Sequence, residues 1–268
     1  MDAESVELRH DLRVDIPVTA ALAVTTVGFR LVRDDLEPSH CRLCDGQTTG
    51  DGQVNVVDDW FRRGLKQQDT QPAQVTSYIL AFGAAPLAGA GLTVLSAIDD
   101  GSSKNVLVDL LIVAEGGFSA MLTTEVLESV TLRARPLVHF AGDEAQVQAE
   151  IDKGGAFHSF PAGHVVEAFG VAAAAGTVAS MRGYRLAPLV WSTGIMIGVA
   201  TGYTRIAADR HYFTDVIAGA AIGSVIGAGV PILFHSPVSS RAFGFGERAR
   251  FFASPIQGGQ LVGIAGTF

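Results

Sequence analysis

The chain has 268 residues, a formal net charge of −8, and 48% hydrophobic against 17% charged residues. That charged fraction lies below the roughly 25% of a typical soluble domain, and the mean hydropathy is +0.32. An acidic chain without a basic stripe of Lys, Arg and aromatic residues is not expected to bind nucleic acid. No linker separates two cores, so we expect one domain.

The first elements in chain order are a polar tail and an apolar run. Residues 1–13 mix acidic and basic side chains, which is not typical of a signal peptide. Residues 14–32 are apolar and, at ~1.5 Å per residue, long enough to cross a ~30 Å hydrocarbon core. A polar loop over residues 33–75 follows, and within it residues 58–68 show helical spacing. We predict that this segment is either an interfacial amphipathic helix or an ordinary loop helix.

The only two cysteines of the sequence, Cys41 and Cys44, lie in this loop as C-x-x-C. A disulfide is favoured if the loop is extracytoplasmic. A redox pair is less favoured, because no thioredoxin-like βαβ pattern follows. A zinc site with His40 and Asp45 would lack a second paired cluster, and free thiols are the remaining alternative.

Five more apolar runs complete the predicted membrane domain, which covers residues 14–235. Asp109 and Glu115 lie within one of these runs, where ionisable residues usually face the bundle interior or water. We interpret both as structural groups, with a role in substrate or proton handling as the alternative. Together with residues 14–32, the five further runs predict an all-α fold of six transmembrane helices. The five runs are residues 76–98, 106–130, 163–180, 186–203 and 212–234.

The end of the chain shows two further patterns. Gly219, Gly223 and Gly227 recur at every fourth position of the last run, a spacing that lets membrane helices approach closely. The tail over residues 236–268 is polar and Gly-rich, with alternation near its end. We predict a short β-hairpin or an irregular tail there.

Three polar motifs border the apolar runs. Residues 132–136 read LRARP, residues 160–164 read FPAGH, and residues 203–215 read YTRIAADRHYFTD. If the segment after His211 is helical, Asp215 lies one turn away on the same face. Its carboxylate could then accept an imidazole N–H and raise the nucleophilicity of the other ring nitrogen. A helix end with a capping Asp is the alternative for this motif alone.

In this order the motifs resemble the three-part signature of the type 2 phosphatidic acid phosphatase (PAP2) family. That signature is K-x6-R-P, then P-S-G-H, then S-R-x5-H-x3-D. The family includes membrane lipid phosphatases and is related to the vanadium haloperoxidases. The resemblance implies a six-transmembrane bundle of PAP2 type that hydrolyses a lipid phosphate or diphosphate. It implies neither a metal nor another cofactor.

The resemblance also implies a role for each matching residue. His211 would be the nucleophile that forms a phosphohistidine, and Asp215 would orient it. His164 would protonate the leaving oxygen and then activate water. The other five histidines have no comparable partners in the sequence and are not expected to be catalytic; they are His10, His40, His139, His158 and His235. The phosphate-binding set would be Arg135, Arg205, Thr204 and the backbone N–H of Gly163.

Some positions depart from the family signature. Glu128 stands in place of the lysine, and Ala162 replaces the serine of the second motif. Thr204 replaces the other serine but keeps its hydroxyl. Arg133 could supply the missing phosphate-binding charge from a different direction. A second hypothesis is therefore a degenerate site that binds phosphorylated lipid without turnover, or a purely structural bundle. Vanadate-dependent halide oxidation is disfavoured, because the haloperoxidases are largely soluble bundles.

Six spans would put both termini on one side of the membrane and all three motifs on the other. Lys and Arg residues in the tails and short loops of the terminus side favour a cytoplasmic location for the termini. The site and the loop 33–75 would then be extracytoplasmic, in the inner membrane of a bacterium. The expected partners are the bilayer and a phosphorylated lipid or a polyprenyl diphosphate. The sequence does not choose among these substrates or give an oligomeric state.

Overall fold

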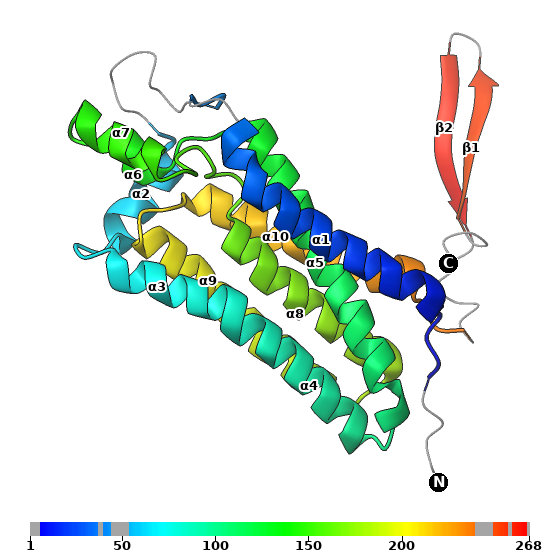
Figure 1. Cartoon of the computed structure of the whole chain (residues 1–268). Coiled ribbons are helices and arrows are strands. Elements are labelled where there is room, and N and C mark those ends of the chain that lie inside the picture. Colours follow the sequence, from blue (N-terminus) through cyan, green and yellow to red (C-terminus); the bar gives the residue numbers. More distant parts are fainter. Residues whose placement is uncertain (1–5, 37–39, 44–53, 239–248, 257–258, 267–268) are drawn as a thin grey trace.

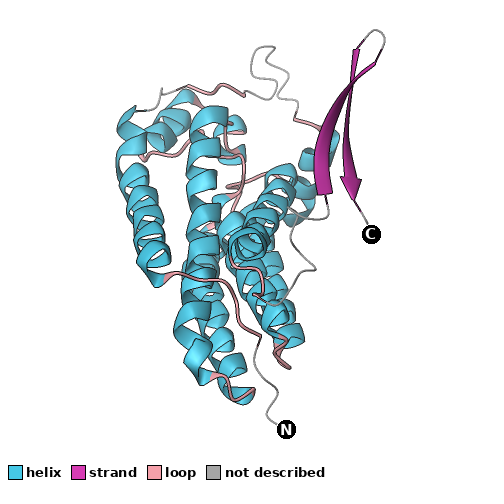
Figure 2. Cartoon of the chain, turned by 90° about the vertical axis from the view of Figure 1, so that its right-hand side faces the viewer, coloured by secondary structure: helices cyan, strands magenta, loops and turns pink. Residues whose placement is uncertain are grey.

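The computed structural model describes residues 6–36, 40–43, 54–238, 249–256 and 259–266. Its helices form one bundle (Figure 1 and Figure 2). The elements are α1 (Leu12–Leu36), α2 (Val56–Leu65), α3 (Gln71–Ile79), the π-helical η1 (Leu80–Ala84), α4 (Ala85–Asp99), the 3-10 helix η2 (Ser103–Asn105), α5 (Val106–Thr131), α6 (Pro136–His139), α7 (Glu144–Asp152), α8 (Gly163–Arg182), α9 (Ala187–Ala207), α10 (Phe213–Phe234), β1 (Ala249–Ile256) and β2 (Gly259–Gly266).

Within the described part of the chain, five helical segments are long and apolar enough to cross a membrane, which indicates an integral membrane protein. The predicted fifth span forms α9, which has 21 residues. Its Ser, Thr and aromatic residues lower its hydropathy, and it is not among the five. The helical fold is therefore confirmed, while the count of six spans stays a prediction. The five segments are Leu12–Arg33, Gln71–Asp99, Ser103–Thr131, Gly163–Arg182 and Phe213–Phe234.

α8 lies at the centre of the bundle and packs against α4, α5, α9 and α10. Its contact with α10 is unusually close. A Cβ atom added at Gly227 would lie 2.2 Å from the carbonyl oxygen of Gly170, and one at Gly223 would lie 2.5 Å from that of Val166. The glycine face of the last predicted span therefore packs directly on the α8 backbone, as small-residue spacing allows.

The start of α1 and the end of α10 lie at one end of the bundle, the terminus end, and the three motifs lie at the other end. At the terminus end, Leu8 forms a β-bridge with Pro237, and the backbone N–H of Val238 donates to the carbonyl of Glu7. At the other end, α5 finishes before the first motif, α8 begins at Gly163 in the second, and α10 begins within the third. This is the arrangement that the order of the predicted spans requires.

The two acids of the third predicted span have structural partners near the terminus end. Buried Asp109 accepts hydrogen bonds from Arg182 at 2.8 Å and from the Tyr184 hydroxyl at 2.6 Å. Glu115 lies 2.8 Å from Nε2 of His235. His235, for which the sequence indicated no partner, therefore has one far from the motifs. These contacts support the structural interpretation of both acids.

The helix predicted in the first loop is α2, and it docks on the bundle through one face. Phe61 stacks on Phe213 of α10, with ring centroids 3.7 Å apart. Arg62 donates two hydrogen bonds to Asp209, at 2.7 and 2.8 Å. Trp60 remains 68% exposed. One face of α2 thus belongs to the bundle surface, and the other is free to contact solvent or headgroups.

Two predictions fall partly on residues outside the described ranges. Cys41 is disulfide-bonded, whereas its predicted partner Cys44 lies outside the described residues. In the C-terminal tail, β1 pairs antiparallel with β2, and residues 239–248 lie outside the described part.

Replacing Gly227 with Ala is expected to destabilise the bundle, because the new methyl group would overlap the Gly170 carbonyl oxygen. Overpacking of this kind costs about 1–3 kcal/mol. Gly229→Ala is the matched control, since it lies in the same helix and nothing lies within 4 Å of an added Cβ. The midpoint of thermal unfolding in detergent measures both variants. Equal midpoints would contradict the close contact.

Candidate active site

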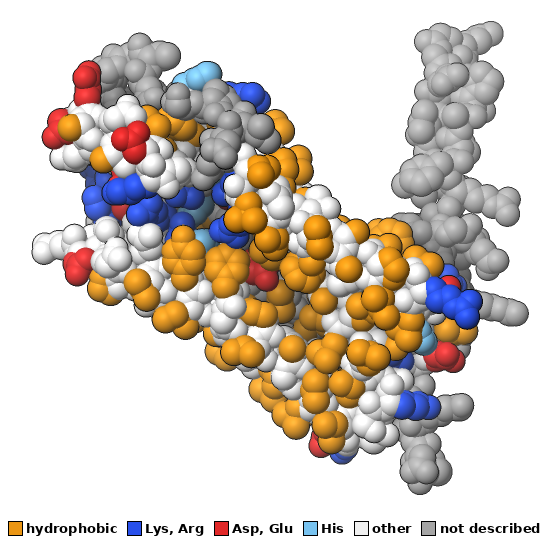
Figure 3. All heavy atoms as spheres, in the orientation of Figure 1, with side chains coloured by type: hydrophobic (Ala, Val, Ile, Leu, Met, Phe, Trp, Pro, Cys, Tyr) orange, Lys and Arg blue, Asp and Glu red, His pale blue; other side chains and the backbone are white. Residues whose placement is uncertain are grey.

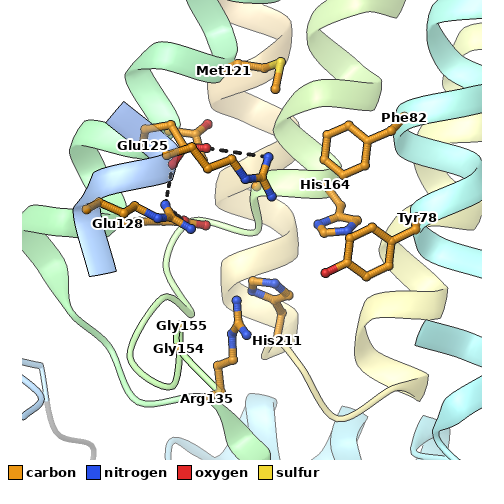
Figure 4. Close-up of a pocket in the computed structure, with 14 residues that line it drawn as sticks. Tyr78, Phe82, Met121, Glu125, Glu128, Arg135, Gly154, Gly155, His164 and His211 are labelled. Carbon is orange, nitrogen blue, oxygen red and sulfur yellow. Dashed lines mark hydrogen bonds and ion pairs between the residues drawn. The ribbon is translucent and has the colours of Figure 1, made fainter. Parts of the chain in front are cut away.

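The three motifs meet around a cavity of ≈ 220 Å³ at one end of the bundle. Figure 4 shows Arg135, His164 and His211 reaching a shared space from three different segments of the chain. Of the residues predicted from the sequence, these three and Gly163 line the cavity. Arg135 and His211, which are 76 residues apart in sequence, are thus brought together, but not every residue of the motifs reaches the site.

His211 lies just before α10 and is buried, with 2% of its surface exposed. Its Nδ1 lies 2.7 Å from the backbone carbonyl oxygen of Ser159. Because a carbonyl oxygen only accepts hydrogen bonds, Nδ1 carries the proton and Nε2 keeps the lone pair. Burial, and then the charges of Arg205 and Arg135, lower the pKa of His211 well below its ordinary value. The side chain is therefore a neutral imidazole with one nucleophilic nitrogen.

Asp215 does not make the direct contact to His211 that the sequence predicted. Its Oδ2 accepts from the Tyr212 backbone N–H at 2.9 Å and from the Ser159 hydroxyl at 2.6 Å. Its Oδ1 accepts from Arg133 at 2.5 Å. Among the described residues, no hydrogen bond joins Asp215 to His211. Asp215 caps α10 and holds Ser159, whose carbonyl in turn contacts the histidine, so its action on His211 is indirect.

Arg133 and Thr204 also lie outside the cavity lining. The Arg133 guanidinium contacts Asp58 at 3.1 Å as well as Asp215, so its single positive charge is shared between two buried carboxylates. The Thr204 hydroxyl donates to the carbonyl of Thr201, 2.8 Å away within α9. Arg133 therefore lies with buried carboxylates rather than on the cavity lining, and its phosphate-binding role stays a prediction. The hydroxyl of Thr204 is used inside its own helix.

The two arginines of the family signature differ in position. Arg135 lines the cavity, and its Nε donates to the His158 carbonyl at 3.3 Å. Burial lowers the pKa of Arg135 to about 10, which still leaves it cationic at neutral pH. Arg205 is 2% exposed and donates to the Ser77 hydroxyl at 3.0 Å. Arg205 does not line the cavity, but its positive charge helps to lower the pKa of His211.

His164 lies in the first turn of α8, and its Nε2 is the second free imidazole nitrogen of the cavity. This atom is buried and has no hydrogen-bond partner among the described residues. The rings of Tyr78 and Phe82 meet the imidazole edge-on, with centroids 4.5 and 4.9 Å away. An unpartnered nitrogen in a polar cavity is available to exchange a proton with a bound ligand.

The start of α8 offers backbone donors to the same cavity. Gly163 is the first residue of this 20-residue helix. A Cβ atom there would lie 3.0 Å from Glu128 Oε1 and 3.2 Å from Thr124 Cγ2, so a side chain would intrude between helices. Without one, the first N–H groups and the positive end of the helix dipole are open to an anion. Ala162, the N-cap, makes no side-chain cap.

Cations from α1 stand beside the position of the family lysine. Arg33 donates to Glu128 Oε2 at 2.7 Å and also contacts Glu125. Arg30 lies 3.8 Å from Glu125. All four side chains line the cavity, as Figure 4 shows for both glutamates. The sequence did not reveal these partners, because Arg33 and Glu128 are 95 residues apart. The one signal was that both lie near the ends of apolar runs.

The structure thus defines a membrane-type helical bundle with histidines and arginines gathered at one end. The PAP2 superfamily model matches residues 109–237, the segment that holds all three motifs. This match confirms the predicted family over that segment.

No curated protein sequence matches the chain. Among solved structures, the crystal structure of the first transmembrane PAP2-type phosphatidylglycerolphosphate phosphatase, from Bacillus subtilis, is similar to it. The sequence identity is 18%, the TM-score is 0.45, and the match covers 78% of this chain and 94% of that one. At this distance the likeness does not extend that substrate to the present chain.

If the cavity hydrolyses a phosphorylated lipid, replacing Arg33 with Ala is expected to lower kcat/KM about 10- to 100-fold, because the lining loses a cation able to contact phosphate. Arg13→Ala is the control, since Arg13 lies on the same helix but is exposed and does not line the cavity. Phosphate release in detergent micelles measures both variants.

The same cluster predicts the effect of restoring the family lysine. Glu128→Lys alone should lower activity, because the new ammonium group would repel Arg33. Combining Arg33→Ala with Glu128→Lys should recover part of the activity. A gain from Glu128→Lys alone would contradict the hypothesis that Arg33 supplies the positive charge of the family lysine.

The lowered pKa of His211 predicts a neutral imidazole at about pH 6, where an ordinary histidine with a pKa of about 6.5 is mostly protonated. NMR of histidine-labelled protein, with His211→Gln to assign the signal, measures this directly. The unfolded chain binds a proton below about pH 6.5 that folded His211 does not, so stability is lost as the pH falls. His211→Gln should reduce that loss. A His211 signal that titrates at or above about pH 6.5 would contradict the prediction.

Proposed function

We propose that this chain is a membrane-embedded phosphatase that hydrolyses a lipid phosphate or diphosphate through a phosphohistidine intermediate. The observation that carries the proposal is a pair of free imidazole nitrogens in one cavity. His211 has its Nε2 lone pair available because Nδ1 is held by Ser159, and His164 has an unpartnered Nε2. Double displacement at phosphorus needs these two groups, a nucleophile and a proton carrier.

In the first step, Nε2 of His211 attacks phosphorus and the bond to the lipid oxygen breaks. Protonated His164 gives its proton to that oxygen, and the lipid alcohol (or the lipid phosphate, from a diphosphate) leaves. In the second step, His164 takes a proton from water, and the resulting hydroxide attacks phosphorus. The P–N bond breaks, which releases inorganic phosphate and regenerates His211. Asp215 acts as a positioning residue through Ser159.

Cations of the chain itself would balance the charge of the phosphoryl group. Arg135 and the two α1 arginines line the cavity, and the start of α8 adds backbone N–H donors. Donors fixed in place before the reaction stabilise the transition state without reorganisation. The proposal therefore includes metal independence, and EDTA should leave the rate unchanged.

We place the site at the membrane surface, on the extracytoplasmic side. In this proposal α9 is the fifth of six spans, because it must return the chain from the terminus end of the bundle to the site end. The positive-inside pattern then puts the termini in the cytoplasm of a bacterium and the site outside its inner membrane. A cavity at the ends of membrane helices lies at headgroup level, which suits a phosphorylated lipid.

Binding without turnover is the second candidate function, and two residues favour it. Glu128 adds negative charge where the family has a cation, and Ala162 lacks a phosphate-binding hydroxyl. Arg33 offsets the first departure. Tight binding of a phosphorylated lipid to folded protein, without phosphate release, would select this candidate over the phosphatase.

Trapping the intermediate tests the proposed mechanism. Protein incubated with EDTA and labelled phosphatidic acid, phosphatidylglycerol phosphate or a polyprenyl diphosphate, then quenched in alkali, should carry labelled phosphate. His211→Ala should abolish both the label and turnover, and His164→Ala should slow turnover about 10²- to 10⁴-fold. His10→Ala is the control, because His10 is exposed and outside the cavity. Phosphate release that survives in His211→Ala would overturn the phosphohistidine.

A further inference from the structure

A second cavity lies deeper in the bundle than the candidate active site. Its volume is ≈ 170 Å³, and it is lined by residues of α4, α5 and α8. The lining is apolar apart from Glu167. Figure 3 shows that the molecular surface around α1 and α4 is mainly apolar as well, with an acidic side chain visible within it.

The two cavities are lined by successive turns of the same three stretches of helix. Residues three or four apart lie on one face of a helix, about 5 Å apart along its axis. The second cavity therefore continues the first by one turn toward the middle of the bundle. On the first stretch, Phe82 lines the first cavity and Pro86 the second. Met121 and Gly117 do the same on α5, and His164 and Glu167 on α8.

Glu167 has an unsatisfied carboxyl group in this apolar cavity. It is 7% exposed, and no described residue gives it a hydrogen bond or ion pair; its Oε2 is buried without a partner. Arg30 acts on it electrostatically, but that guanidinium lies 3.8 Å from Glu125 and over the ring of Phe82. A carboxylate charge is costly in such surroundings, whereas a neutral carboxylic acid fits and has one O–H donor that needs an acceptor.

A glycerol-based lipid would bring that acceptor with it. When its phosphate is bound at His211, its ester carbonyl oxygens follow a few bonds further along, and then its hydrocarbon chains. An ester carbonyl accepts hydrogen bonds and cannot donate them, so it complements a carboxylic acid. A polyprenyl diphosphate has only hydrocarbon beyond its phosphates and would leave the acid unsatisfied, which weakens binding.

We propose that Glu167 donates a hydrogen bond to an acyl ester of a glycerol-based lipid phosphate, and so selects this substrate class over polyprenyl diphosphates. The proposal rests on the phosphatase function proposed above. It makes Glu167 a specificity-determining residue one helical turn from His164, in a part of the chain that none of the three motifs covers.

Hydrolysis of diacyl phosphatidic acid and of its dialkyl ether analogue, in the same micelles, tests the ester contact. The two lipids share phosphate, glycerol and chain length, and differ in the carbonyl oxygens. Wild type should prefer the diacyl lipid about five- to tenfold in kcat/KM, as one hydrogen bond allows. Glu167→Leu should bring this ratio to about one. Glu167→Gln, which keeps a donor, should retain the preference.

Leu110→Ala is the matched control, because Leu110 lines the same cavity without a polar group and should affect both lipids alike. If Glu167 serves instead to hold Arg30, then Glu167→Gln and Glu167→Leu should lower kcat/KM for the diacyl and the dialkyl lipid equally. The ratio of the two values would then stay unchanged, which would overturn the proposal. A wild-type ratio of one would also overturn it, even if Glu167→Leu fails to fold. Phosphate release from either lipid would still support the phosphatase. No release from any lipid by folded wild type would refute the proposed function itself.

Discussion

The close contact between α8 and α10 is the constraint on which the site depends. The backbones touch along a line of glycines, where a Cβ atom at Gly223 or Gly227 would overlap a carbonyl oxygen of α8. The starts of the two helices are also joined directly, because the Ala162 N–H donates to the Asp215 carbonyl at 3.1 Å. His164 and His211 come from these two starts, so helix packing fixes the relative position of the two imidazoles.

Around this fixed pair, the buried cations fall into two groups. Arg33 and Arg133 each contact two carboxylates, which offsets the cost of removing their charge from water. Arg135 and Arg205 are different: the hydrogen bonds described for them go to a carbonyl and a hydroxyl. Their positive charge has no hydrogen-bonded counterion among the described residues. Under the proposed function, a phosphate dianion in the cavity beside Arg135 would bring a counterion to this end of the bundle.

The spans were predictable from the sequence because an apolar run is a local property. The run predicted at residues 163–180, for example, forms α8 from Gly163 to Arg182, and the motif order was enough to indicate the family. Contacts across the chain were not predictable in the same way. The spacing of His211 and Asp215 suggested one helical face, but α10 begins only at Phe213. His211 is therefore outside the helix, and the four-residue rule does not apply to it. The pairing of Arg33 with Glu128 likewise depends on how α1 packs on α5, which no local pattern encodes.

The order of side chains along α8 suggests how a lipid would lie in the protein. From the site end toward the middle of the bundle, successive turns carry His164, Glu167 and Val171, and the last two line the deeper cavity. A membrane lipid presents the same order of charge, ester and hydrocarbon. Under the proposed function, a lipid alongside α8 would meet matching polarity at each depth without leaving the bilayer. The products would separate along the same axis, because phosphate is soluble in water and the lipid alcohol is not. Their separation into two solvents opposes the reverse reaction.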